Sequence, residues 1–201
     1  MAVLYRLLTL LALATLLATP LAGCERSAAP SFKAIDITGA EYAQGFDLPD
    51  ASGQRRTLAD FKGKVTVVFY GFTQCPDVCP TTLSELAQVK QMLGADGARV
   101  QGVFVTIDPE RDTAEILKAY VGNFGADFVA LRGSLEETQA AAKEFKVFYA
   151  KVPGKTEGSY TMDHTAGSYV FDAQGRVRLF TRYGTGAEAL VHDLRLLLAE
   201  G

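Results

Sequence analysis

The chain has 201 residues, of which 48% are hydrophobic and 21% are charged, and its formal net charge is -3. This is the composition of an ordinary globular protein, and the length suits one domain with a sizeable core. The slightly acidic balance provides no basic surface for a phosphate backbone, so we expect no binding of nucleic acid.

The first 24 residues have the pattern of a bacterial export signal that ends in a cysteine. Arg6 precedes the apolar run LLTLLALATLLA and a small-residue segment that ends at Cys24. The final tetrapeptide, LAGC, resembles a lipobox, which implies cleavage just before Cys24 and lipidation of its sulfur. The alternative is an uncleaved membrane helix over residues 4–23, which Pro20 and the shortness of the apolar run disfavour. Either arrangement tethers the rest of the chain to a membrane, outside the cytoplasm.

We therefore expect three parts along the chain. Residues 1–23 form a lipoprotein signal peptide, residues 24–40 a lipidated N-terminus with a flexible tether, and residues 41–201 a single domain. The tether is predicted from a short polar stretch rich in Ala, Ser and Pro. The expected location is the bacterial cell envelope, on the cytoplasmic membrane and facing the periplasm.

Strand and helix patterns alternate through the domain. Extended segments around a turn at 50–53 and a short helical turn at 58–64 come first. Four strands with a closing hairpin, and four helices, follow from apolar runs and from periodicity. The expected strands are 64–72, 100–108, 127–131 and 147–152, with a hairpin at 168–172 and 176–183; the expected helices are 82–93, 112–125, 134–145 and 187–199.

Capping boxes mark the expected starts of three helices: Thr82 with Glu85, Asp112 with Glu115, and Ser134 with Glu137. A polar loop is expected over 153–163. This order of elements predicts an α/β domain with a mixed central sheet and helices on both faces.

Two cysteines follow the first buried strand directly, in GFTQCPDVCPTT. Cys75 and Cys79 could form a structural disulfide, a redox-active dithiol or part of a metal site. A loop this short stabilises little as a disulfide. The carboxyl end of a strand and the amino end of a helix are places for ligands and for thiolates, so we expect both thiols to have lowered pKa values.

Histidine is scarce in this chain, and the positions of its histidines decide between a redox-active dithiol and a metal site. A closed zinc site needs four ligands, whereas Cu(I) accepts two thiolates and one imidazole. His192 falls on the polar side of the last helix and is expected to be a surface residue. His164 lies between the polar loop and a buried strand, where it can reach the cysteines or can simply be a turn residue. Asp163 is a candidate for the hydrogen-bond acceptor that orients it.

Three segments, FYGFTQCPDVCPTTL, VTIDPERDT and DHTAGSYVFD, together resemble the Sco/SenC family of thioredoxin-like copper proteins. The resemblance covers almost the whole domain and implies that Cys75, Cys79 and His164 bind one copper ion, as Cu(I) or Cu(II). It also implies a role in assembling the CuA centre of cytochrome c oxidase. We assign the DPERDT segment, Asp108–Thr113, a structural role as the end of a strand and the cap of a helix.

Two functions of different classes follow from the resemblance. The first is a monomeric metallochaperone that passes copper to subunit II of the oxidase and receives it from another periplasmic carrier. The second is a thiol-disulfide oxidoreductase with Cys75 and Cys79 as its redox-active pair. Thioredoxin-type reductases have CxxC and a proline before the facing strand; this chain has one more residue between its cysteines and His164 near that position, which favours the chaperone. A peroxidase is weaker, because nothing in the sequence singles out one thiol.

Overall fold

The structure, a computed structural model, describes residues 31–201. The predicted signal peptide, Cys24 and the first part of the predicted tether lie outside the described residues. Within residues 31–201, no helix has the length and apolar character needed to cross a membrane.

A six-stranded mixed sheet forms the centre of the domain. In spatial order its strands are β1 (Ile35–Asp36), β10 (Val177–Arg182), β9 (Gly167–Phe171), β4 (Val65–Gly71), β5 (Val100–Thr106) and β6 (Val129–Leu131). The strands β4, β5 and β6 are parallel, and the other neighbours are antiparallel. Gly71 at the end of β4 pairs with Thr106 at the end of β5, so both strands end at the same edge of the sheet.

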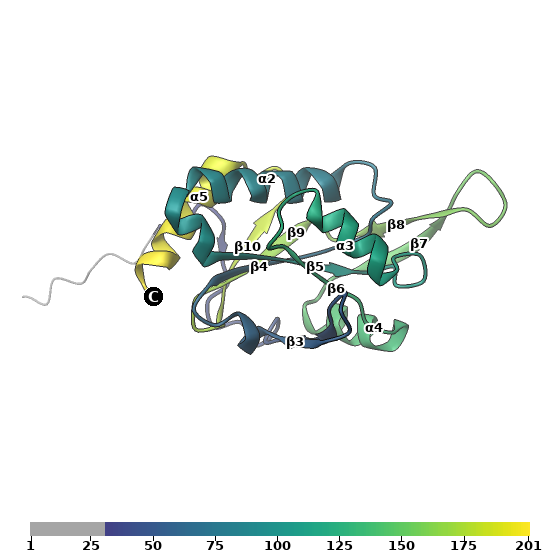
Figure 1. Cartoon of the computed structure of the whole chain (residues 1–201), viewed down its shortest axis with the longest axis horizontal. Coiled ribbons are helices and arrows are strands. Elements are labelled where there is room, and N and C mark those ends of the chain that lie inside the picture. Colours follow the sequence, from purple (N-terminus) through teal and green to yellow (C-terminus); the bar gives the residue numbers. More distant parts are fainter. Residues whose placement is uncertain (1–30) are drawn as a thin grey trace, which may run out of the picture. The chain divides into compact units, whose positions relative to one another are not determined.

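Helices cover both faces of this sheet, as expected (Figure 1). One face carries α2 (Val78–Met92), α3 (Ala114–Gly122) and α5 (Ala187–Ala199); the other carries α4 (Leu135–Glu144) and the hairpin of β2 (Asp47–Pro49) and β3 (Arg55–Thr57). Two 3-10 helices, η1 (Leu58–Phe61) and η2 (Gly94–Arg99), precede β4 and β5. A separate hairpin of β7 (Tyr149–Pro153) and β8 (Tyr160–His164) extends from the domain at the right of Figure 1.

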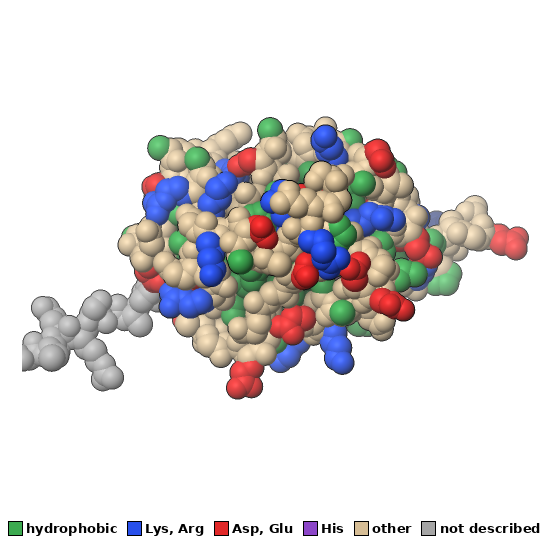
Figure 2. All heavy atoms as spheres, turned by 60° about the horizontal axis from the view of Figure 1, so that its bottom comes forward, with side chains coloured by type: hydrophobic (Ala, Val, Ile, Leu, Met, Phe, Trp, Pro, Cys, Tyr) green, Lys and Arg blue, Asp and Glu red, His purple; other side chains and the backbone are tan. Residues whose placement is uncertain are grey.

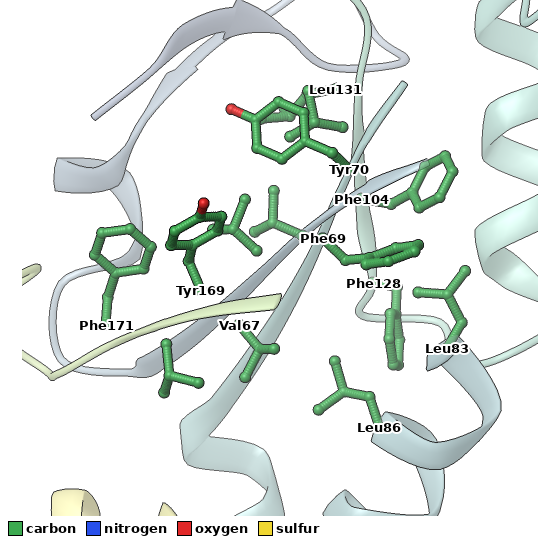
Figure 3. Close-up of a cluster of buried hydrophobic side chains, with 14 of the residues drawn as sticks. Val67, Phe69, Tyr70, Leu83, Leu86, Phe104, Phe128, Leu131, Tyr169 and Phe171 are labelled. Atoms are coloured by element: carbon green, nitrogen blue, oxygen red, sulfur yellow. The ribbon is translucent and has the colours of Figure 1, made fainter. Parts of the chain in front are cut away.

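The core lies on both sides of the central strands (Figure 3). Phe69 and Tyr70 are neighbours in β4, at most 1% exposed, and point to opposite faces because strand side chains alternate. Phe69 packs against Phe104 of β5 with ring centroids 6.0 Å apart, and Tyr70 packs against Phe145 at 5.1 Å. Each such ring stabilises the fold by about 1.5–3 kcal/mol relative to its exposed state.

The surface over α4 and the β2–β3 hairpin carries basic and acidic side chains that are interspersed (Figure 2). Arg55, for example, bridges Asp47 and Glu137, at 2.8 Å in each case. Because exposed pairs of this kind contribute about 0–1 kcal/mol each, stability depends on the core rather than on this face.

A buried carboxylate fixes the first described residues to the last helix. Asp193 of α5 is fully buried and accepts hydrogen bonds from the backbone N–H groups of Lys33 at 2.8 Å and Ala34 at 2.7 Å. The chain then forms β1, which pairs with β10. Residues 33–36, which the sequence predicts as part of the tether, therefore belong to the folded domain.

Helix α2 begins earlier than predicted. It starts at Val78, with Asp77 at the N-cap position, and not at Thr82. Pro80 therefore lies in the first turn, which tolerates proline because the N–H groups there have no partner within the helix. Thr82 instead donates a hydrogen bond to the carbonyl of Val78.

Two further predictions about element ends are corrected, and one is confirmed. Thr113, and not Asp112, caps α3, because its hydroxyl accepts from the N–H of Ile116. The second half of the expected loop 153–163 is strand β8, which pairs with β7. The capping box of Ser134 and Glu137 is confirmed at the start of α4.

Replacing Asp193 with alanine is expected to reduce the free energy of unfolding by about 1–3 kcal/mol, because the N–H groups of Lys33 and Ala34 would lose their acceptor. Urea denaturation of the domain measures this change. Glu157→Ala, at an exposed position between β7 and β8, is the control and should change stability by less than about 0.5 kcal/mol. Equal midpoints for the two variants would contradict the clamping role of Asp193.

Candidate metal centre

Two cysteines and one histidine meet at the carboxyl edge of the central strands. Cys75 lies in the loop between β4 and α2, Cys79 in the first turn of α2, and His164 at the end of β8. Their ligand atoms all lie within 4.8 Å of one another. Among residues 31–201 this is the one group of three His, Cys, Asp or Glu side chains with the geometry to hold a metal ion.

The two thiols have different environments. Both are free, but Cys79 is fully buried while Cys75 is partly exposed. A hydrogen bond from the Cys79 side chain, supported by the backbone N–H groups of Asp77 and Cys79, lowers the pKa of Cys75 to about 5. The same shared hydrogen bond, together with burial, raises the pKa of Cys79. The expectation of two lowered pKa values is therefore wrong for Cys79, and Cys75 is singled out as the thiolate.

The His164 ring presents one nitrogen to the sulfurs and uses the other for orientation. Its Nε2 lies 3.6 Å from the Sγ of Cys79, and its Nδ1 lies 3.0 Å from the carbonyl oxygen of Thr165. Because a carbonyl can only accept, Nδ1 carries the proton of this contact, and Nε2 is the nitrogen that faces the sulfurs. The sequence had left open whether this histidine reaches the cysteines, and the structure brings them together.

Asp163 does not have the orienting position suggested for it. It is exposed, and the carbonyl of Thr165 makes the contact with the ring instead. Adjacent residues of β8 point to opposite faces, so a strand that directs His164 inward directs Asp163 outward. The sequence predicts both residues at the end of a loop, where this alternation does not apply.

Aromatic rings and a glycine surround the site. The His164 ring is 6.0 Å from the rings of both Phe69 and Phe72, with edge-to-face geometry in each pair. A Cβ on Gly71 would lie 2.8 Å from the Cys79 sulfur and 2.9 Å from the ring of Phe104. The sulfur therefore packs directly on the backbone of β4, a contact that only glycine permits.

Asp112 is a buried residue of the site that the sequence analysis misassigned. Its carboxylate accepts hydrogen bonds from the N–H of Thr73 at 3.1 Å and from the hydroxyls of Thr73 and Thr106, each at 2.5 Å. Burial raises its pKa. Asp112 thus ties the start of the cysteine loop to the end of β5. The neighbouring Thr113 could have indicated this role from the sequence. Threonine is itself a good N-cap residue, so Thr113 leaves the carboxylate of Asp112 free for another role.

The second histidine lies elsewhere. His192 is on α5, with 44% of its side chain exposed, and its Nδ1 lies 2.8 Å from Asp193. It is a surface residue, as expected.

This chain has a thioredoxin-like α/β domain with two thiols and an imidazole at one edge of the sheet. Small proteins of this class bind soft metal ions or exchange disulfides. The family model described as SCO1/SenC matches residues 36–199. The chain belongs to the SCO1/SenC family.

Known proteins support this assignment. The mouse protein named "Protein SCO2 homolog, mitochondrial" is 38% identical over 166 residues, which are 80% of this chain and 64% of the mouse protein. The chain thus spans less than two thirds of that relative. The apo Sco1 structure from Thermus thermophilus has a TM-score of 0.75 and 37% identity, covering 85% of this chain and 99% of that one. Bradyrhizobium japonicum ScoI, solved with copper bound, has a TM-score of 0.69 and 38% identity, covering 77% and 98%. The thioredoxin-like fold predicted from the sequence is confirmed.

Alkylation of the reduced, metal-free protein should modify Cys75 before Cys79. Only the thiolate reacts, so the rate at Cys75 should rise as the pH increases through about 5 and be level at neutral pH. An unperturbed thiol would still gain reactivity above pH 8. Iodoacetamide labelling between pH 4 and pH 9, read by peptide mass spectrometry, measures both rates. Faster labelling of Cys79, or a rate at Cys75 that keeps rising above pH 8, would contradict this asymmetry.

Gly71→Ala should reduce the free energy of unfolding by about 1–3 kcal/mol, because the new methyl group overlaps the Cys79 sulfur and two aromatic rings. Gly122→Ala is the matched control: its added Cβ would meet no atom within 4 Å apart from its chain neighbours and the nearby backbone of its own helix, and alanine suits helix α3 better than glycine. Chemical denaturation compares the two. Similar stability for both variants would show that the sulfur is not held against β4.

Proposed function

We propose that this protein is a copper metallochaperone that binds one copper ion through Cys75, Cys79 and His164 and delivers it to the CuA centre of cytochrome c oxidase. The observation that carries the proposal is the convergence of two thiols and an imidazole nitrogen within 4.8 Å. Ligand atoms that share one ion at about 2.0–2.3 Å are separated by up to about 4.6 Å, so small side-chain adjustments suffice.

The chemistry of the donors suits copper better than zinc. Soft thiolates favour Cu(I), and a three-ligand set satisfies it, whereas structural zinc takes four ligands. Cys75 is already a thiolate at neutral pH, and Nε2 of His164 faces the sulfurs as the third donor atom. Cys79 supplies the second thiolate by losing its proton when the metal binds, as metal-ligating thiols do.

The accessibility of the ligands suits delivery of a cargo. Cys75 and His164 are partly exposed, while Cys79 is buried under them. A recipient can therefore approach from the side of Cys75 and His164 and replace ligands one at a time. His164 is a neutral ligand and is the arm that we expect to leave first.

The proposed partners follow from the family. The resemblance to Sco/SenC proteins implies the CuA domain of oxidase subunit II as recipient and another periplasmic carrier as donor. The copper-bound structure of the Bradyrhizobium relative supports the choice of metal. We further propose that the protein acts as a monomer, held by a lipid on Cys24 at the periplasmic side of the cytoplasmic membrane.

One observation favours thiol-disulfide exchange as a second function. A partly exposed thiolate at Cys75 beside a buried thiol at Cys79 is the arrangement of an attacking and a resolving cysteine. Cys75 would attack a disulfide of the target, and one target thiolate would leave. Cys79, deprotonated, would then attack the mixed disulfide, releasing the second target thiolate and leaving Cys75 and Cys79 oxidised. Such a reaction would prepare the cysteines of a CuA site for copper.

Anaerobic titration of the reduced domain with Cu(I), and then with Cu(II), tests the chaperone function. The parent should bind one equivalent tightly, with thiolate-to-copper charge-transfer absorption in the Cu(II) form. Cys75→Ser, Cys79→Ser and His164→Ala should each weaken binding by about tenfold or more, since each removes one of three ligands. His192→Ala is the control and should bind like the parent.

The same experiment can contradict the proposal. Equal binding by His164→Ala and the parent would remove the imidazole from the site, and undiminished uptake by the oxidised protein would argue against thiolate ligation. No tight site, together with rapid exchange with disulfide substrates, would establish the oxidoreductase instead.

A further inference from the structure

His164 is carried by a strand that is outside the main sheet. Within the described part of the chain, residues 31–201, the strands β7 and β8 pair only with each other, and Tyr149 at the base of the hairpin faces His164. Alternate residues of β8 place Tyr160, Met162 and His164 on one face. Met162 is buried, which identifies this face as the one packed against the domain. The position of the imidazole thus depends on contacts that hold this face in place.

Arg111 supplies such contacts from the segment between β5 and α3. Its Nη1 donates to the side-chain oxygen of Gln74, beside Cys75, at 3.0 Å and to the backbone carbonyl of Tyr160 at 2.8 Å. Its guanidinium carbon lies 3.6 Å from the centre of the Tyr160 ring, so the charged plane also stacks on the strand. One side chain therefore joins the cysteine loop to the strand that bears the histidine.

Asp108 completes this connection. Its carboxylate is 1% exposed, accepts from the Nε of Arg111 and, through its other oxygen, accepts from the hydroxyl of Tyr160 at 2.9 Å. The carboxylate, the guanidinium and the phenol thus form a closed set of contacts. The DPERDT segment, to which the sequence analysis gave only the roles of strand end and helix cap, makes a direct contact with the hairpin.

We propose that Arg111 is a positioning residue that latches the β7–β8 hairpin to the cysteine loop and so holds His164 over Cys75 and Cys79. The inference rests on the proposed function in that it assigns this placement to copper binding. Residues that orient a metal ligand typically affect affinity by about 10- to 100-fold when they are replaced. Arg111 acts through the hairpin and does not touch the metal ligands themselves.

The test compares Arg111→Ala with Arg132→Ala. The Arg132 side chain donates two hydrogen bonds to the carbonyl of Pro109 in the same segment and, among residues 31–201, makes no hydrogen bond to the hairpin, so it controls for general loosening. In the reduced, metal-free protein, NMR cross-peaks between the rings of His164 and Phe72 report the closed position. Arg111→Ala should lose them and should bind Cu(I) about 10- to 100-fold more weakly, whereas Arg132→Ala should keep both properties.

Two further variants separate positioning from folding. Tyr160→Ala removes the stacked ring without leaving an uncompensated charge at Asp108, and it should reproduce the loss of cross-peaks. Arg111→Lys keeps the positive charge but not the planar guanidinium. Compared with Arg111→Ala, it should therefore be more stable but should still lack the cross-peaks. These variants decide the question if Arg111→Ala fails to fold.

The outcomes distinguish this inference from the proposed function. Retained cross-peaks in folded Arg111→Ala and Tyr160→Ala would overturn the latch, whatever their copper affinity. If these variants lose the cross-peaks and the parent protein binds no copper, the latch would be supported and the chaperone function overturned.

Discussion

The contact between the Cys79 sulfur and the backbone of Gly71 is the constraint on which the metal centre depends. It brings the first turn of α2 against the end of β4, where the rings of Phe69 and Phe104 also approach Gly71. Because β5 runs parallel to β4, its end lies at the same edge, and Asp112 can bind the start of the cysteine loop there. The loop that holds Cys75 is thus fixed at both ends before any metal is bound.

The asymmetry of the two thiols follows from the same packing and connects the two proposed activities. The hydrogen bond from Cys79 to Cys75, together with burial, keeps Cys79 protonated, and the same hydrogen bond stabilises the thiolate of Cys75. A thiolate beside a thiol can attack a disulfide, and with an imidazole close by it can also bind a soft cation. Both proposed activities would therefore depend on the same pair of cysteines.

Sequence patterns predicted the parts of the structure that depend on local chemistry. The buried strands, the helix cap at Ser134 and the spacing of the cysteine pair are all of this kind. The direction of the Asp163 side chain depends on β8 being a strand. The segment is a strand because it pairs with β7, and its own polar sequence does not predict this. The role of Asp112 depends on hydroxyls that arrive from two other elements, and no local pattern contains that information.

The central claim is that two sulfurs and one ring nitrogen hold a single copper ion. X-ray absorption spectroscopy of the Cu(I)-loaded domain tests it most directly, because sulfur and nitrogen neighbours scatter differently. The account predicts two sulfur ligands and one nitrogen ligand per copper, with the nitrogen signal lost in His164→Ala. A spectrum of sulfur ligands alone, or one unchanged in His164→Ala, would contradict it.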